Sequence, residues 1–339
     1  MAFINQSMTI RILWVICIAF TLSGCLENDK ARAQFENYQS RLASVLDTEP
    51  FLLSAPSYIE LPRKRDLTLP VEDVRMGLLD AYELRTCGLF QLIADRNSIL
   101  GKVQDGFRQL QYEITLLSTL EKCLNQIETE SLKTQLESAY QQKREQFPTV
   151  YWNTISTSDA WRKQLTPSSS ALILPGEPFP HSDALVALTG YANLSEDSTD
   201  IVTLQEPLEK QRYLGNVFYS MDESTRWLTA TTRQLYRDDA LIVCGANRDP
   251  TRLNYMRNVF DKFFVGEVQP YLSKINSLYL DAQPALLQLN EKLPEHPLLN
   301  EYRNAYFAGK HYQAFQNATK DHVQYWQRLF QRCNIKVGN

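Results

Sequence analysis

The chain has 339 residues, of which 35 are Lys or Arg and 39 are Asp or Glu, so its formal net charge is −4. This balance excludes an overall basic surface, and we therefore expect no nucleic-acid partner. With 44% hydrophobic and 22% charged residues the composition is that of a globular protein, and the length suffices for one large or two smaller domains.

The first 24 residues have the pattern of a secretory signal peptide. Arg11 precedes an apolar run over residues 12–22, which is about half as long as a membrane-spanning helix. The run leads into Leu-Ser-Gly-Cys at residues 22–25, which resembles the lipobox of bacterial lipoproteins. This resemblance implies cleavage before Cys25, acylation of that cysteine and, because Leu26 rather than Asp follows, transfer to the outer membrane. The alternative is an ordinary signal peptide whose cleavage region contains a cysteine.

Residues 25–70 are expected to comprise the lipid anchor, a helix and a proline-rich segment. The helix is predicted over Ala31–Asp47. Residues 50–70 contain four prolines, which favour an extended path. They also contain the basic run Arg63-Lys64-Arg65, which we interpret as a solvated turn, with contact to anionic lipid head groups as the alternative.

Residues 71–165 are predicted to form an N-terminal helical subdomain. One apolar stripe at helical spacing runs from Val71 to Ile93, and a second runs from Leu110 to Leu124. A polar helix over 128–146 is expected to stop at Pro148, and a short helix should follow over 151–165. Residues 166–182, rich in proline and serine, are predicted to be a linker.

Residues 183–339 are predicted to form a C-terminal helical bundle. Helices are expected over 183–194 and 208–243, and a third beginning at Thr251 should kink at Pro270. From Tyr312 to Cys333 the apolar residues alternate steps of three and four, which indicates a packing seam. Convincing strands are few, so we predict an all-α fold of two packed helical bundles or subdomains.

The four cysteines after the signal peptide predict two disulfides, because their number is even and the expected compartment is oxidising. Cys87 and Cys123 lie on consecutive predicted helices at similar distances from the turn, so an antiparallel hairpin brings them level. Cys244 and Cys333 each end a long helix and form the second pair. None of the four has the close spacing of metal ligands, so no metal is expected.

The sequence contains no local signature of catalysis. There is no glycine-rich phosphate loop, no His-Glu-x-x-His and no Gly-x-Ser-x-Gly, so we expect no cofactor and assign no catalytic residue. His311 and His322 share a helix face but lie about 16 Å apart along the axis, too far to bind one metal. His322 is on the apolar seam, and we interpret it as a hydrogen-bonded core residue. Sites assembled from distant residues leave no such signature and stay possible.

Two polar segments are candidates for one ligand site. The first ends a predicted helix near Gly101, and the second spans the helix with Pro270. Helix capping is the competing explanation, because Asn and Ser near a helix end and a terminal Gly are typical of caps. The candidate ligand cluster comprises Arg96, Asn97, Arg257, Asn258 and Gln269.

The same segments resemble a family of Gram-negative lipoproteins of unknown function, domain-of-unknown-function family 3080. The resemblance implies a helical, envelope-exposed lipoprotein and carries over no catalytic residue. Besides the lipobox, it rests on Leu61-Pro62 with the basic residues after it, Cys87-Gly88-Leu89, Arg96-Asn97-Ser98, Tyr151-Trp152-Asn153, Arg257-Asn258-Val259-Phe260, Val268-Gln269-Pro270-Tyr271 and Trp326-Gln327-Arg328-Leu329 with Cys333.

We expect an outer-membrane-anchored periplasmic protein that binds an envelope protein, glycan or lipid without catalysis. The alternative is an enzyme acting on an envelope polymer or lipid, with a site assembled between the two subdomains.

Overall fold

The computed structural model describes residues 29–56, 58–72, 82–169, 182–195, 198 and 200–335. The fold is all-α, as predicted, with no strand in these ranges. None of the helices in the same ranges is long and apolar enough to cross a membrane. The expected signal peptide with Cys25, residues 73–81 of the first stripe and residues 170–181 of the expected linker lie outside the described residues.

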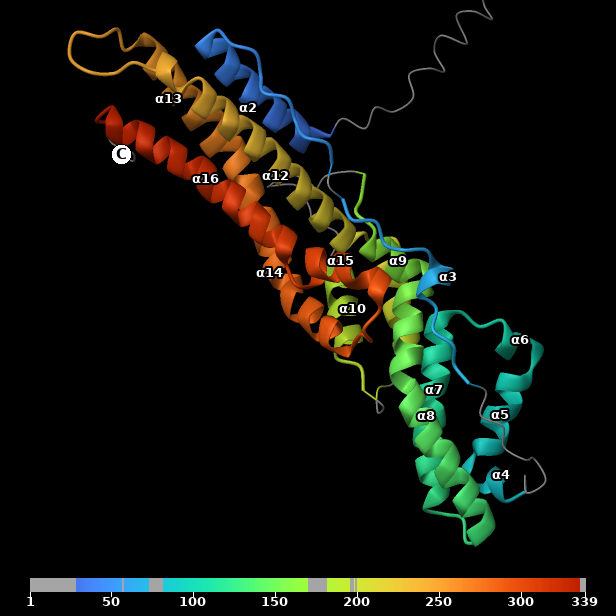
Figure 1. Ribbon diagram of the computed structural model, residues 1–339. Coiled ribbons are helices and arrows are strands. Elements are labelled where there is room, and N and C mark those ends of the chain that lie inside the picture. Colours follow the sequence, from blue (N-terminus) through green and yellow to red (C-terminus); the bar gives the residue numbers. More distant parts are fainter. Residues whose placement is uncertain are drawn as a thin grey trace, which may run out of the picture.

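Figure 1 shows an elongated molecule in which α4 and the far ends of α7 and α8 form one end and α13 lies at the other. The first half of the chain forms the helices α2 (Lys30–Leu46), α3 (Lys64–Leu67), α4 (Glu83–Cys87), α5 (Leu89–Asn97), α6 (Ile99–Lys102), α7 (Gly106–Leu124), α8 (Glu130–Thr157) and α9 (Asp159–Leu165). Side-chain caps begin several of these helices. Asp29 accepts the Arg32 N–H and Asp105 the Arg108 N–H, both at 3.0 Å.

The second half forms α10 (Ser182–Ala192), η2 (Ile201–Leu204), α11 (Gln205–Lys210), α12 (Tyr213–Arg237), η3 (Asp239–Leu241), α13 (Thr251–Val259), η4 (Phe260–Val268), α14 (Gln269–Lys292), η5 (Pro297–Leu299), α15 (Asn300–Tyr302), η6 (Arg303–Phe307) and α16 (Lys310–Arg332). Of the η elements, η4 and η6 are π-helices and the others are 3₁₀ helices. Helix α12 packs along α16, while α2 packs against α12, α13 and η4.

The described residues form two hydrophobic cores. The larger core joins α2, the start of α7, the end of α8, and the helices from α9 to α16. It therefore contains side chains from both sides of residues 166–182. The smaller core comprises side chains of α4, α5, the second half of α7 and the start of α8, together with Ile127.

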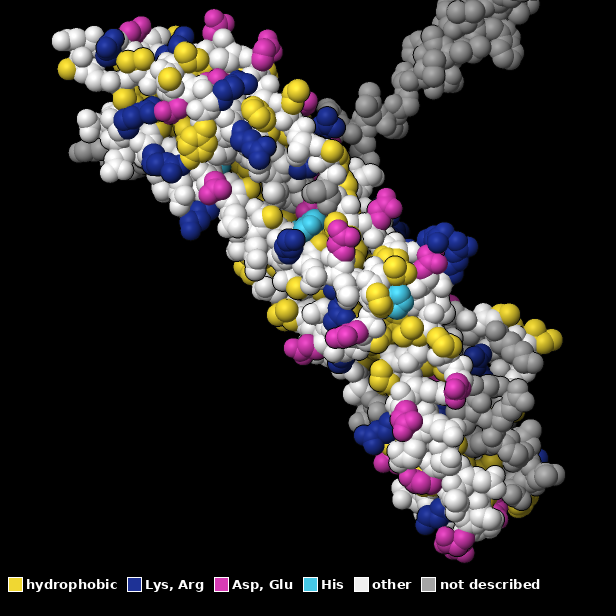
Figure 2. Space-filling model, viewed as in Figure 1, with side chains coloured by type: hydrophobic (Ala, Val, Ile, Leu, Met, Phe, Trp, Pro, Cys, Tyr) yellow, Lys and Arg dark blue, Asp and Glu magenta, His cyan; other side chains and the backbone are white. Residues whose placement is uncertain are grey.

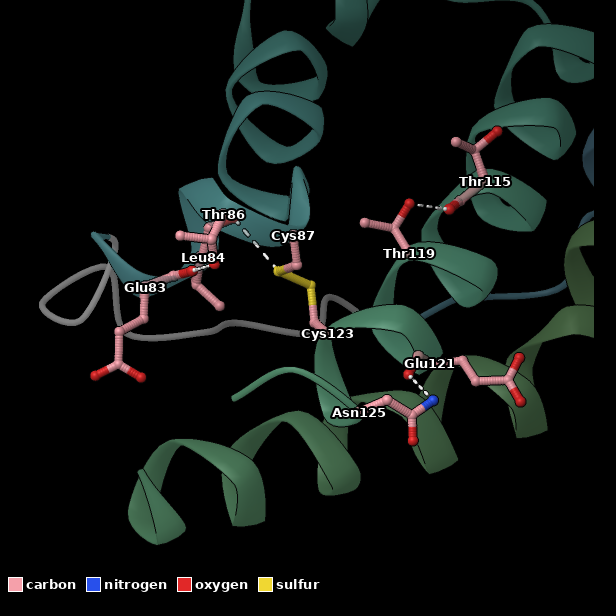
Figure 3. The surroundings of a disulfide bond; sticks show 9 residues. All are labelled: Glu83, Leu84, Thr86, Cys87, Thr115, Thr119, Glu121, Cys123 and Asn125. Carbon is pink, nitrogen blue, oxygen red and sulfur yellow. Dashed lines mark hydrogen bonds between the residues drawn. A yellow bond between two sulfur atoms is a disulfide. The ribbon is translucent and has the colours of Figure 1, made fainter. Parts of the chain in front are cut away.

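Both predicted disulfides are present. Cys87 at the end of α4 bonds Cys123 of α7, with 5.2 Å between their Cα atoms, and Figure 3 shows this bridge between the two helices. Cys244 bonds Cys333, with 5.3 Å between Cα atoms, and joins the ends of the segments that follow α12 and α16. The first bridge lies in the smaller core and the second at the edge of the larger core.

The expected stop at Pro148 is wrong, because α8 continues through this proline to Thr157. A proline inside a helix removes one backbone hydrogen bond and favours a bend. The residues that follow it are anchored in the larger core, where Val150, Tyr151 and Trp152 are at most 3% exposed. Their burial offsets the lost bond. The helix ends instead before Ser158, whose side chain caps α9 by accepting the Trp161 N–H at 3.4 Å.

The helix predicted over 208–243 is interrupted at residues 211–212, where α11 ends and α12 begins. The Gln164 side chain from α9 occupies this break. Its Nε2 donates to the carbonyl oxygens of Leu208, at 2.7 Å, and Gln211, and its Oε1 accepts the Leu214 N–H at 3.0 Å. One fully buried amide thus satisfies the end of one helix and the start of the next.

A π-helix directly precedes Pro270, the residue at which a kink is predicted. Residues 260–268 form η4, and the Gln269 N–H bonds the Phe264 carbonyl five residues earlier. Pro270 follows as the second residue of α14, directly after the π-helix. Within this π-helix Phe264 packs on Tyr38 of α2 and His322 of α16.

Candidate functional site

A groove of about 580 Å³ lies between α16 and the stretch from η4 into α14. Its floor is apolar, because Phe264, Leu272 and Phe315 are at most 3% exposed. Its walls carry mainly amides and hydroxyls, with one cation. The polar wall residues are Gln269, Ser273, Asn276, Gln316, Thr319, Lys320, Gln324 and Gln327.

Tyr312 fixes two of the wall amides at one end of the groove. Its hydroxyl donates to Asn276 Oδ1 at 2.7 Å and accepts from Gln316 Nε2 at 2.9 Å. Within the described part of the chain, Asn276 Nδ2 and Gln316 Oε1 have no protein partner. The groove therefore presents an oriented donor beside an oriented acceptor, the combination that a hydroxyl or an amide of a ligand requires.

A second groove, of about 410 Å³, lies on the other side of α16, against α12. Arg233 of α12 and Arg328 of α16 line it, together with Asp321. The Arg328 guanidinium lies over the Tyr236 ring, 5.4 Å from its centroid. Gln324 lines both grooves, so the outer face of α16 separates two adjacent polar depressions.

A buried carboxylate joins α12 to α16 near the middle of the molecule. Asp222 Oδ1 lies 2.7 Å from His311 Nδ1, and its Oδ2 accepts a 3.1 Å hydrogen bond from the Tyr306 hydroxyl. Burial raises the pKa of Asp222, and the bonds from His311 and Tyr306 partly oppose this shift. Tyr306 reaches the carboxylate from the π-helix η6. This pair was not predicted, because its members lie 89 residues apart in the chain and share no local motif.

His322 is a core residue, as predicted, and is 0% exposed. Trp326 Nε1 donates to its Nε2 at 3.2 Å, so Nε2 is an acceptor, and Nδ1 lies 2.9 Å from Thr232 Oγ1. The Tyr38 hydroxyl lies 2.8 Å from the same Nε2. Desolvation lowers the pKa of His322 to about 3. The ring is therefore neutral at physiological pH and links α2, α12 and α16.

The structure does not bring the five residues of the predicted ligand cluster together. Figure 1 places α5, with Arg96 and Asn97, far from α13, with Arg257 and Asn258. Arg96 donates to the Gly101 carbonyl and lies over the Tyr112 ring. Arg257 is exposed and pairs with Asp261 at 3.5 Å, while Asn97 and Asn258 are exposed.

Gln269 alone among the five lines the groove between α14 and α16. The other wall residues were not predicted, although a pattern existed. Gln316, Lys320, Gln324 and Gln327 recur at helical steps of four, four and three along the last helix, beside the apolar seam. Such a polar stripe is usually a solvated helix face, and only the position of α14 makes it one wall of a groove.

Among the described residues, no group of three or more His, Cys, Asp or Glu side chains is placed to hold a metal ion.

Comparison with known proteins identifies the family. No curated protein and no solved structure matches the chain. The sequence model of a family described as "Protein of unknown function (DUF3080)" matches residues 35–337, which is most of the chain and includes every residue of the groove between α14 and α16. The chain therefore belongs to the DUF3080 family.

Proposed function

We propose that this protein is a lipid-anchored envelope protein, facing the periplasm from the outer membrane, that binds a glycan in the groove between α14 and α16. The observation that carries the binding proposal is the groove itself, whose size is typical of ligand sites. Its many amides and hydroxyls suit a ligand rich in hydroxyl groups, because each such group both donates and accepts. The buried apolar floor suits the less polar face of a sugar ring.

The location rests on the N-terminal sequence and gains support from the disulfides. Residues 22–25 have the lipobox pattern, and Leu26 follows. Cys87–Cys123 and Cys244–Cys333 bring all four later cysteines into pairs. Paired cysteines are typical of an oxidising compartment such as the periplasm. Globomycin, which blocks lipoprotein signal processing, should lead to accumulation of the precursor. A mature protein whose mass shows no acyl chains would contradict the anchor.

The enzyme alternative depended on a pocket that holds Arg96, Asn97, Arg257 or a histidine. None of these residues lines the two grooves beside α16. Asp222 and His311 form a carboxylate–imidazole pair suited to proton transfer, but they too lie outside both grooves. We therefore favour binding over catalysis.

Calorimetric titration with soluble peptidoglycan fragments tests the binding proposal. The protein used is the mature chain with Cys25→Ser, which removes only the acylation site. The disaccharide-containing fragments should bind, whereas the stem peptide alone should not. Binding of the peptide alone would replace the glycan by a peptide ligand, and binding of neither would contradict the proposal.

Matched variants on α16 locate the binding site. Gln316→Leu and Gln324→Leu each remove groove amides and should weaken binding about two- to tenfold, the effect of one uncharged hydrogen bond. Gln313→Leu and Gln331→Leu change exposed amides of the same helix outside the groove and should leave the affinity unchanged. Equal affinities in all four variants would place the ligand elsewhere.

A further inference from the structure

The short helix α6 and the residue after it expose three apolar side chains. We call these residues, 99–103, the tip. In α6, Ile99 is 86% and Leu100 80% exposed, and Val103 directly after it is 75% exposed. In Figure 2 hydrophobic side chains project from the surface where Figure 1 places α6. Single exposed hydrophobic residues are ordinary on protein surfaces, but three within five positions form a patch that indicates a binding surface.

Hydrogen bonds from the residues before the tip to Gly101 hold its backbone in a defined conformation. Ser98 caps α6 by accepting the Gly101 N–H at 3.1 Å and donates to the Asp95 carbonyl at 2.7 Å. Arg96 donates to the Gly101 carbonyl. A Cβ on Gly101 would lie 2.3 Å from the Asp95 carbonyl oxygen, so only glycine fits here. The geometry of this turn is therefore set by local bonds, and Ile99, Leu100 and Val103 stay exposed.

The tip lies along the same long edge of the molecule as the start of α2, the first described helix after Cys25. In Figure 1 the beginning of α2, α3 and α6 follow one another along this edge, and Figure 2 shows Lys and Arg side chains gathered at α3 between the other two. Asp29, at the start of α2, is four residues from Cys25, so the chain between them spans at most about 14 Å. An acylated Cys25 would thus hold the start of α2 close to a lipid surface.

The basic residues of this edge fit the same surface. Arg63, Lys64 and Arg65 have side chains that are 69%, 46% and 72% exposed. Asp66 and Asp159 pair with them, which leaves an excess of one positive charge among these five residues. This charge attracts anionic head groups only weakly, so burial of the apolar side chains of the tip contributes most of the membrane affinity.

We propose that Ile99, Leu100 and Val103 insert into the phospholipid leaflet that holds the acyl anchor, so that the molecule lies with this edge against the membrane. The inference rests on the proposed lipid anchor. It also gives a role to Arg96-Asn97-Ser98, one of the segments on which the family resemblance rests. Arg96 and Ser98 stabilise the conformation of a membrane-inserting tip, and no ligand site is needed to explain them.

Fluorescence quenching by brominated lipids tests the insertion. The acylated mature protein is reconstituted into vesicles with equal parts of phosphatidylethanolamine and phosphatidylglycerol, with and without bromine on the acyl chains. Tryptophan is introduced as Leu100→Trp in the tip or, as a control, as Tyr255→Trp, which is 55% exposed on α13 at the other end. The native residues Trp152, Trp161, Trp227 and Trp326 are buried and contribute equally to both variants.

The added emission of Leu100→Trp should be largely lost in brominated vesicles, while that of Tyr255→Trp should persist. The mass of the reconstituted protein is measured first, because a mass without acyl chains contradicts the anchor and not the tip. An acylated, vesicle-bound protein with unquenched Leu100→Trp overturns the insertion, and so does equal quenching at both positions.

A second measurement does not depend on introduced tryptophan. Vesicle binding should slow amide hydrogen exchange at residues 99–103 of the unmodified protein. The triple variant Ile99→Ser, Leu100→Ser, Val103→Ser should lose this protection while its unfolding transition is unchanged, because all three side chains are exposed. A photo-crosslinker at position 100 that captures a single protein and no lipid would also overturn the proposal.

Discussion

Nδ1 of His322 lies 2.9 Å from Oγ1 of Thr232, so the long helices α12 and α16 are joined by a side-chain hydrogen bond inside the core. On the other side of the ring, Nε2 accepts from Trp326 and lies 2.8 Å from the Tyr38 hydroxyl of α2. Burial of the ring disfavours its protonated form and lowers the pKa of His322, and this shift couples the stability of the fold to pH.

We expect the free energy of unfolding to fall as the pH falls from 6.5 towards 3. The unfolded chain binds a proton at His322 near the ordinary pKa of 6.5, whereas burial lowers the pKa in the folded protein to about 3. Between these values only the unfolded state is protonated there, which weakens the fold by about 1.4 kcal/mol per pH unit. Urea denaturation at several pH values should show a shallower dependence for His322→Gln than for the unmodified protein. Parallel curves for the two proteins contradict this, and His296→Gln, which retains His322, serves as the control.

Loss of the Cys87–Cys123 bridge should destabilise the part of the protein around the smaller core. The bridge closes a loop with a sequence separation of 36, so the double variant Cys87→Ser, Cys123→Ser should lose about 4 kcal/mol in the chain-entropy model. Because both cysteines belong to the smaller core, hydrogen exchange should accelerate first in α4 and α5. The matched variant Cys244→Ser, Cys333→Ser should instead accelerate exchange at the end of α16. The same exchange pattern in both variants would contradict this assignment.

Asn153 should contribute to stability by holding the extended segment before residue 70 against α8. Its Oδ1 accepts the Leu69 N–H at 2.9 Å, and its Nδ2 donates to the Leu69 carbonyl at 2.8 Å. Asn153→Ala removes both bonds and should lower the free energy of unfolding by about 2 kcal/mol. Asn258→Ala, at an exposed position of α13, should change it by less than about 0.5 kcal/mol. Chemical denaturation measures both, and equal effects would argue against the tie between Asn153 and Leu69.

Gly215 should tolerate no side chain, because α12 crosses the end of α9 at this residue. A Cβ here would lie 2.6 Å from the Thr166 carbonyl oxygen, and the Gly215 carbonyl accepts the Ser168 N–H at 2.8 Å. Gly215→Ala should therefore destabilise the protein by about 1–3 kcal/mol through overpacking. Gly266→Ala has 3.6 Å to its nearest neighbour and should be neutral or stabilising. A thermal melt that ranks the two variants in the opposite order would show that α12 and the end of α9 move apart to accommodate the added methyl group.

Short-range patterns were sufficient for much of the fold. The seam from Tyr312 to Cys333 became α16, and Ala31–Asp47 became α2 with a shift of one residue at each end. The predicted hairpin brought Cys87 level with Cys123, because α7 runs back beside α4 and α5. The Pro148 prediction failed for a physical reason: local propensity disfavours proline inside a helix, but the burial of Trp152 and its neighbours outweighs that preference.

The amino-acid sequence by itself determined the helical class and the core position of His322, since both follow from apolar spacing along single helices. It also determined the two disulfide pairs, because a hairpin aligns Cys87 with Cys123 and leaves Cys244 and Cys333 at two helix ends. Only the tertiary structure decided which polar residues meet. The groove combines Asn276 with Gln316, and the buried pair combines Asp222 with His311, from helices far apart in the chain. Their proximity depends on how α12, α14 and α16 pack, and helix packing is set by side-chain fit over whole helix faces rather than by any local pattern.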